Sequence, residues 1–211
     1  MKLRQRRTNR WTGATGSEFR RKRDPAKLIG NAVAVISAVI LLVLMVIRLE
    51  EQKDWTAVHS VNVAAFRTSA EAHLVDVLRE QARPYVSLVA EDNGIVIGHI
   101  MFSPVSLTGH SALSIMGLGP MAVSPAHQRR GVGSALVRAG LARSQELGFG
   151  AVVVLGCPGF YPRFGFSTSD HFDIGCEYEV PADTFMVVEL QTGFLRGATG
   201  TIKYHSAFGD V

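Results

Sequence analysis

Residues 121–166 read MAVSPAHQRRGVGSALVRAGLARSQELGFGAVVVLGCPGFYPRFGF, and this stretch decides the fold of the 211-residue chain. An apolar, strand-like run ends near Val123, a polar loop follows over residues 128–134, and a helical pattern begins after it. A loop at the start of a helix presents free backbone N–H groups and the positive end of the helix dipole. Glycines let that backbone come close to a bulky anion, and Arg129 and Arg130 add positive charge. The loop therefore predicts a binding site for a pyrophosphate.

Two motifs in this stretch resemble those of one enzyme superfamily. Gln128-Arg129-Arg130-Gly131-Val132-Gly133 resembles the Gln/Arg-x-x-Gly-x-Gly/Ala signature of the GNAT superfamily of N-acetyltransferases. Residues 161–166, YPRFGF, resemble the family's Tyr-x-x-x-Gly-Phe element, and residues 185–208 are similar to the YhbS-like branch. A lone Gly-x-Gly would be a weak signal, but this one lies between a predicted strand and a predicted helix. The resemblance extends from about Met45 to the C-terminus.

This resemblance implies a fold and an activity. The fold is α/β, with an α+β mixed sheet: a GNAT acyl-CoA N-acyltransferase fold has a central, mostly antiparallel sheet with a splayed fourth and fifth strand, flanked by helices. The activity is that of an acyltransferase enzyme, which moves an acetyl group from acetyl-CoA to a primary amine of a small molecule or peptide by direct attack in a ternary complex. The alternative is a non-catalytic GNAT-like module that senses acyl-CoA, with or without a membrane anchor.

The resemblance also implies where acetyl-CoA binds. The strand end would hydrogen-bond the pantetheine arm through its backbone, and the loop amides would hold the pyrophosphate, so N–H geometry matters more than side chains. An ordinary helix-start turn is the alternative role for the two glycines. The implied coenzyme-binding residues are Met121, Ala122, Val123, Gln128, Arg129, Arg130, Gly131, Val132, Gly133 and Ser134.

Tyr161 is the candidate catalytic residue, because it matches the tyrosine that the family often uses as a general acid toward the departing thiolate. A phenol has a pKa of about 10, so it is protonated at neutral pH and can donate. Pro162 follows it, which a helix tolerates only in its first turn. A packed tyrosine with a satisfied hydroxyl is the alternative.

No general base can be assigned from the sequence. Many relatives use a Glu in the fourth strand, but residues 113–123 contain no carboxylate. Glu91, Asp92 and His99 lie in neighbouring predicted strands, and each is expected to be a solvated turn or sheet residue. A chain of waters could deprotonate the amine instead. Cys157 has no identifiable histidine partner and is expected to be a small buried residue.

The residue types also exclude several classes of site. Cys157 and Cys176 are the only cysteines, so no disulfide framework is predicted and a reducing compartment fits. The seven histidines show no His-x-x-x-His spacing, so no metal is expected. Residues 131–136, GVGSAL, lack the third glycine of a dinucleotide-binding fingerprint, which argues against a Rossmann enzyme.

The N-terminal part of the chain differs from the rest. Residues 1–27 carry a charge of +8, whereas the remainder carries −4. Such a tail could touch nucleic acid or acidic lipid, but an ordinary tail is favoured and no nucleic-acid partner is expected. Residues 28–47 form an uncharged apolar run of about the length that spans a membrane.

This run conflicts with the first predicted strand, over residues 45–49, because a spanning helix and a strand cannot share Met45 to Ile47. We therefore expect residues 1–44 to be an upstream extension and residues 45–211 to be the acetyltransferase domain, located in the cytoplasm. A single-span membrane anchor through residues 28–47 is the alternative. The sequence leaves a homodimer open.

Hydrophobic periodicity places the remaining elements. Helices are predicted over residues 55–66 (with Asp54 as N-cap), 70–81 and 132–147, and a short helix or turn over 160–164. Strands are predicted over residues 85–91, 95–102, 113–123 and 151–155, with a loop over 103–111. Asn93-Gly94 is a strong hairpin turn. The resemblance implies a bulge in the fourth strand that opens a slot for the pantetheine arm, and Gly119-Pro120 is consistent with it. A simple irregularity of the strand is the alternative.

Overall fold

The computed structural model describes residues 45–66 and 68–210. The larger elements in this part of the chain are β1 (Met45–Leu49), α2 (Trp55–Ala65), α3 (Ala70–Gln81), β2 (Val86–Asp92), β3 (Ile95–Leu107), β4 (Ile115–Val123), α4 (Val132–Glu146), β5 (Ala151–Leu155), β8 (Phe185–Glu189) and β9 (Gly200–Lys203). The short ones are η1 (Gln52–Asp54), η2 (Pro125–His127), η3 (Tyr161–Phe164), β6 (Ser167–Thr168), η4 (Ser169–Phe172), β7 (Ile174–Cys176) and η5 (Ser206–Asp210).

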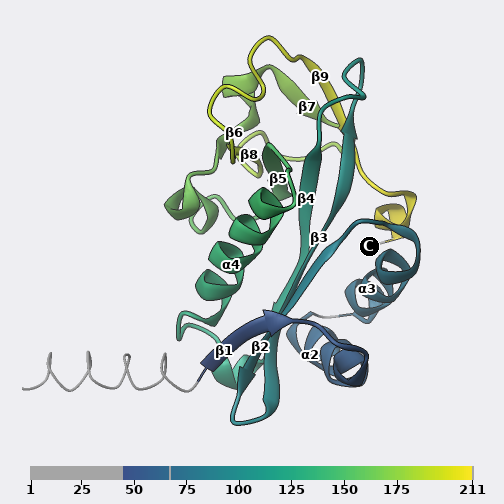
Figure 1. Cartoon of the computed structure of the whole chain (residues 1–211), viewed down its shortest axis with the longest axis vertical. Coiled ribbons are helices and arrows are strands. Elements are labelled where there is room, and N and C mark those ends of the chain that lie inside the picture. Colours follow the sequence, from purple (N-terminus) through teal and green to yellow (C-terminus); the bar gives the residue numbers. More distant parts are fainter. Residues whose placement is uncertain (1–44, 67, 211) are drawn as a thin grey trace, which may run out of the picture. The chain divides into compact units, whose positions relative to one another are not determined.

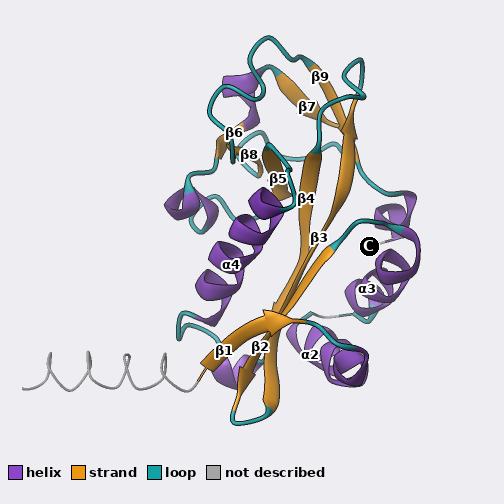
Figure 2. Ribbon diagram, in the orientation of Figure 1, coloured by secondary structure: helices purple, strands orange, loops and turns teal. Residues whose placement is uncertain are grey.

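The strands form one mixed sheet in the order β1-β2-β3-β4-β5-β8-β6, and β9 pairs with both β3 and β7. Neighbouring strands run antiparallel except in the pairs β4–β5 and β7–β9. Helix α4 lies on one face of the sheet, and α2 and α3 lie on the other (Figure 1; Figure 2). The predicted fold, a mostly antiparallel sheet flanked by helices, is confirmed.

The central strands are buried on both faces. Leu88, Ile100 and Phe102 belong to the core beneath α4, whereas Val89 and Met101 belong to the core beneath α2 and α3. Because successive side chains of a strand point to opposite faces, a strand covered by helices on both sides is apolar along its length. This arrangement holds the two helical layers at fixed positions over β2 and β3.

The pairing of β4 changes at Gly119 and Pro120. On the neighbouring strand, Ile100 pairs with Met121 and Phe102 with Leu118, so one residue of β3 lies opposite these two residues of β4. On the other side, β4 pairs with β5 only as far as Leu118, and then continues to Val123 while β5 ends at Leu155. The predicted bulge and the splay of the fourth and fifth strands are therefore both present.

The predicted loop over residues 103–111 is wrong in its first half, because β3 continues to Leu107. Pro104 pairs with Met116 of β4, at a stretch after β2 has ended and before β9 joins at Ser106. Proline has no N–H and is tolerated in a strand where one edge is unpaired. Pro104 led us to predict the end of the strand, but β3 continues there and only its neighbour changes, from β2 to β9.

Asp54 lies at the N-cap position of α2, but its carboxylate caps no helical N–H. Arg48 Nη2 donates to it at 2.8 Å and the backbone N–H of Glu51 donates at 2.8 Å. The hydrogen bond from Arg48, followed by that from the Glu51 backbone, lowers the pKa of Asp54 to about 2. Asp54 therefore joins β1 to the start of α2.

Met45 and Ile47 belong to β1, where they pair with Asp92 and Ala90 of β2. A membrane-spanning helix cannot include them, and the rest of the apolar run, residues 28–44, lies outside the described residues. None of the helices between residues 45 and 210, residue 67 excepted, combines the length and apolar character needed to cross a membrane.

A chain of buried polar side chains connects α2 and α3 to the sheet. Arg79 Nη2 donates to Glu50 Oε1 at 2.7 Å, and Ser87 Oγ donates to Glu50 Oε2 at 2.7 Å. His99 Nε2 lies 2.9 Å from Ser87 Oγ, and His99 Nδ1 lies 3.2 Å from Asn62 Nδ2. Since the Ser87 proton points to Glu50 and the Asn62 nitrogen can only donate, His99 carries its proton on Nε2. His99 is neutral there, because burial lowers its pKa to about 3.

Candidate active site

The loop between β4 and α4 is held in one conformation by its glycine and by a side chain. Gly131 has φ of 90°, a left-handed conformation that places it as the N-cap of α4. Gln128 Nε2 donates to the carbonyl of Val123 at 3.1 Å, which fixes the loop to the end of β4. The first helical hydrogen bond runs from Ala135 N–H to Gly131 O at 3.0 Å. The N–H groups of residues 132–134 therefore have no carbonyl one turn earlier to bind.

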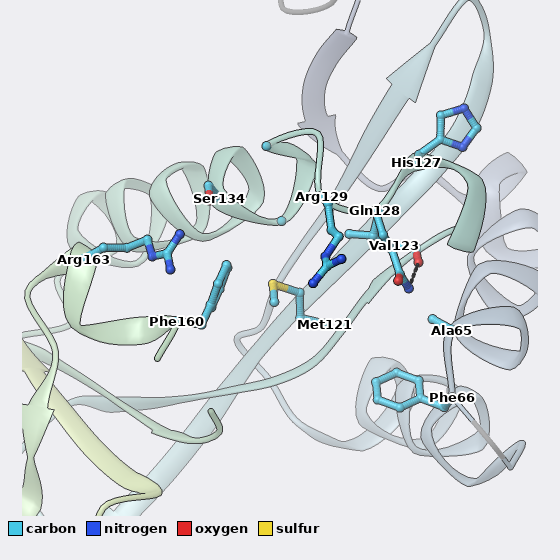
Figure 3. A pocket seen from close by; sticks show the side chains of 12 residues that line it. Ala65, Phe66, Met121, Val123, His127, Gln128, Arg129, Ser134, Phe160 and Arg163 are labelled. Carbon is cyan, nitrogen blue, oxygen red and sulfur yellow. Dashed lines mark hydrogen bonds between the residues drawn. The ribbon is translucent and has the colours of Figure 1, made fainter. Parts of the chain in front are cut away.

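This loop borders a cavity of about 560 Å³. The loop and the end of β4 form one side, Phe160 and Arg163 another, and the end of α2 a third (Figure 3). In Figure 3 the Arg129 side chain points toward Met121, and the ring of Phe160 lies on the other side of Met121. The lining residues are Ala65, Phe66, Met121, Val123, His127, Gln128, Arg129, Gly131, Gly133, Ser134, Phe160 and Arg163.

Seven of the ten predicted coenzyme-binding residues line this cavity, and three do not. The side chains of Ala122 and Val132 are buried in the protein, with 1% and 3% of their surface exposed. Their backbone alone can reach a ligand. Arg130 is exposed on the loop and lies outside the lining.

A second cavity, of about 270 Å³, lies where β4 and β5 separate. Phe66 and Met121 line both cavities, so the two are neighbours. The lining residues are Phe66, Glu71, Leu74, Leu118, Gly119, Pro120, Met121, Leu155, Tyr161, Tyr204 and Phe208. The bulge of β4 thus provides the floor of this smaller cavity.

Tyr161 lines the smaller cavity from the first residue of η3. Its ring packs edge-on against Phe160 and Phe166, at centroid distances of 5.1 and 5.6 Å. A Cβ at Gly156 would lie 2.2 Å from the Tyr161 ring, so only glycine leaves room for it. Burial raises the pKa of Tyr161 to about 12. The phenol therefore stays protonated throughout the physiological range.

The profile of the Acetyltransferase (GNAT) family matches residues 51–166. The chain is also 38% identical, over 165 residues, to the "Uncharacterized N-acetyltransferase YhbS" of Escherichia coli (strain K12). These residues make up 78% of this chain and 98% of that protein. The chain belongs to the GNAT family of acetyltransferases.

Two solved GNAT structures are similar in fold and in sequence. The crystal structure of YhbS from Escherichia coli in complex with CoA has a TM-score of 0.74 and 37% identity, and the match covers 78% of this chain and 92% of that one. A GNAT acetyltransferase from Brucella melitensis in complex with acetyl-CoA has a TM-score of 0.65 and 36% identity, covering 78% and 97%.

The three candidate general bases, Glu91, Asp92 and His99, form hydrogen bonds with other residues of the protein, away from both cavities. Glu91 Oε2 accepts from Arg48 Nη2 at 2.6 Å, and Asp92 Oδ1 accepts from Asn93 at 2.9 Å. His99 is fully buried in the sheet and not solvated as predicted, because Ser87 and Asn62 satisfy its ring nitrogens. None of the three lines either cavity.

The prediction for Cys157 is wrong, since its side chain is exposed after the end of β5. The ring of Tyr161, and not the side chain of Cys157, packs against Gly156. Among residues 45–66 and 68–210, no three His, Cys, Asp or Glu side chains gather as metal ligands would.

Sequence reasoning missed most of the side chains that border the two cavities outside the motifs. They come from the end of α2, the start of α3 and the C-terminal segment, and include Phe66, Glu71, Leu74, Tyr204 and Phe208. No local pattern marks these positions, because they reach the cavities only through the packing of segments that lie far apart in the sequence.

Proposed function

We propose that this protein is an N-acetyltransferase that moves the acetyl group of acetyl-CoA to a primary amine of a small molecule or peptide, by direct attack in a ternary complex. The observation that carries this proposal is that the two cavities are neighbours, with Phe66 and Met121 lining both. One cavity has the groups that suit the coenzyme, and the other contains Tyr161. Two substrates bound in them would meet without a covalent intermediate on the enzyme.

The larger cavity suits the coenzyme for three reasons. The N–H groups at the start of α4, together with Arg129, would bind the pyrophosphate. The unpaired edge of β4, from Met121 to Val123, would bind the amides of the pantetheine arm through its backbone. Relatives of 37% and 36% identity hold CoA and acetyl-CoA, which supports the same ligand here. Arg130, exposed outside the lining, would contribute only longer-range charge.

Tyr161 would act on the departing thiolate mainly as a hydrogen-bond donor. Its pKa is about 12. A thiol such as that of cysteine has a pKa of about 8.5, so complete proton transfer from the phenol to the thiolate is uphill by about 5 kcal/mol. A hydrogen bond to the developing negative charge has no such cost and strengthens in the transition state. The sulfur then takes its proton from the attacking amine.

We further propose that residues 45–211 form the acetyltransferase domain and that residues 1–44 are an extension dispensable for activity. Support comes from the match to the Escherichia coli protein, which aligns 98% of that protein with 78% of this chain. Acetyl-CoA is a cytoplasmic metabolite, which favours a cytoplasmic location over an anchor through residues 28–47. Equal turnover by the full chain and by residues 45–211 is the expected result, and an insoluble product from the shorter chain would favour the anchor.

The experiment that tests the activity is a thiol-release assay with acetyl-CoA and a panel of amines and peptides. We expect release of free coenzyme A that depends on both acetyl-CoA and one class of amine, together with an N-acetylated product. Tight binding of acetyl-CoA with no amine-dependent release would contradict the proposal and favour an acyl-CoA sensor.

A further inference from the structure

We propose that the smaller cavity binds the acceptor amine, that Glu71 receives its ammonium group and removes its proton, and that the acceptor carries this amine on an apolar body. This inference rests on the proposed acetyl transfer, and names the acceptor site and the general base that the proposed function leaves open.

The charge of the cavity lining supports the first part. Of the eleven described residues that line it, Glu71 alone is a carboxylate and none is Lys, Arg or His. A primary amine is cationic near neutral pH, since a lysine side chain has a pKa of about 10.4. Among these described residues the carboxylate of Glu71 is the single charge, which attracts such a cation and would repel an acidic acceptor.

The position of Glu71 fits this role. It is the second residue of α3, is half-buried, and faces the same cavity as Tyr161. Thr68 Oγ1 donates to Glu71 Oε2 at 3.2 Å, which orients the carboxylate. Two carboxylate oxygens offer about four acceptor sites, so this bond leaves capacity for an ammonium group.

The remaining lining indicates the body of the acceptor. Phe66, Leu74, Leu155, Tyr204 and Phe208 are aromatic or aliphatic, and line the cavity together with the Gly119-Pro120 bulge. A cavity of about 150 Å³ holds benzene. About 270 Å³ therefore has room for one ring or a short alkyl chain with its amine. Aromatic faces also attract a neighbouring cation.

Glu71 and Tyr161 would act in successive steps of the acetyl transfer. The ammonium group gives one proton to Glu71, and the neutral nitrogen forms a bond to the thioester carbonyl carbon. The carbon–sulfur bond breaks, its electron pair leaves with the sulfur, and Tyr161 donates a hydrogen bond to the thiolate. The second amine proton passes to the sulfur, and Glu71 releases the first proton to water. The products are the N-acetylated amine, coenzyme A and one proton.

A glutamate in the first turn of a helix also stabilises the helix dipole, so the test must separate catalysis from that structural role. Glu71→Gln keeps the shape and removes the charge. Glu80→Gln is the matched control, because Glu80 is an exposed residue of the same helix and lines neither cavity. The probes are 2-phenylethylamine and hexylamine, with ethanolamine and a glycyl dipeptide as polar competitors.

With the apolar amines near neutral pH, we expect Glu71→Gln to lower kcat/KM by about 100-fold or more, in the range typical of a lost general base. The loss should shrink near pH 10, where the amine itself loses its proton. Glu71→Asp should recover part of the rate, Glu80→Gln should match the wild type, and the KM for acetyl-CoA should not change in any variant.

Equal activity of the two Gln variants, a loss that is the same at both pH values, or a preference of the wild type for the polar amines would each overturn the inference while leaving acetyl transfer in place. Absence of thiol release from every amine would instead remove the proposed function, and this inference with it.

Discussion

Replacing Gly133 with Glu should abolish most of the affinity for acetyl-CoA without disturbing the fold. A Cβ at this position would lie 3.7 Å from both Met121 Cε and Phe160 Cζ, which is ordinary van der Waals contact inside the larger cavity. The added carboxylate would then share that cavity with the pyrophosphate. Two like unit charges 4 Å apart repel by about 1 kcal/mol in water and about 4 kcal/mol at a protein surface. The dissociation constant should therefore rise by about 5-fold to 1,000-fold.

Titration calorimetry with acetyl-CoA measures this change. Gly133→Gln is the matched control, because it adds the same bulk without the charge. The difference between the two variants should shrink at high salt, where charges are screened. Equal affinities of the Glu and Gln variants at low salt would refute the assignment of the pyrophosphate to this loop.

Three further predictions concern catalysis and stability. Tyr161→Phe should lower kcat by about 100-fold with little change in the affinity for acetyl-CoA, and an unchanged kcat would reduce Tyr161 to packing. Gly140→Ala should lower the free energy of unfolding by about 1–3 kcal/mol in urea, because the new Cβ would lie 2.1 Å from Phe102 Cε2; an unchanged urea midpoint would contradict this packing. His99 has its pKa lowered to about 3, so the unfolded chain binds its proton first as the pH falls below about 6.5. As the pH falls from about 6.5 to 3, His99 should therefore lower the free energy of unfolding by about 1.4 kcal/mol per pH unit. If the unfolding free energy of His99→Gln depends on pH with the same slope as that of the wild type, this prediction is wrong.

The sequence was sufficient for the conformation of the loop over residues 128–134 and for the strands around it, because their signals are local. Gly131 adopts a φ of 90° and Asn93-Gly94 adopt 49° and 80°, conformations that glycine and asparagine favour and other residues avoid. The bulge at Gly119 and the end of the short helix Tyr161–Phe164 at Gly165 also rely on glycine at a positive φ. At such positions the residue type alone indicates which φ angle the backbone can adopt.

The remaining features depend on contacts between distant parts of the chain. The C-terminal half of β3 is a strand because β4 pairs with Phe102 to Val105 and β9, about one hundred residues further along, pairs with Ser106 and Leu107. His99 is neutral because it is buried in the sheet, and its ring nitrogens are satisfied by Ser87 and Asn62, which both lie far from it in sequence. Glu71 reaches the smaller cavity because α3 packs against β4 and η5. A single sequence contains no local pattern for these relations.

A crystal structure of the protein with coenzyme A would show directly where the coenzyme binds. We expect the pyrophosphate on the N–H groups of residues 132–134, the pantetheine arm along Met121 to Val123, and the thiol in the opening between β4 and β5, next to Tyr161. Coenzyme bound outside the larger cavity, or a thiol that lies away from Tyr161 and the smaller cavity, would contradict this prediction.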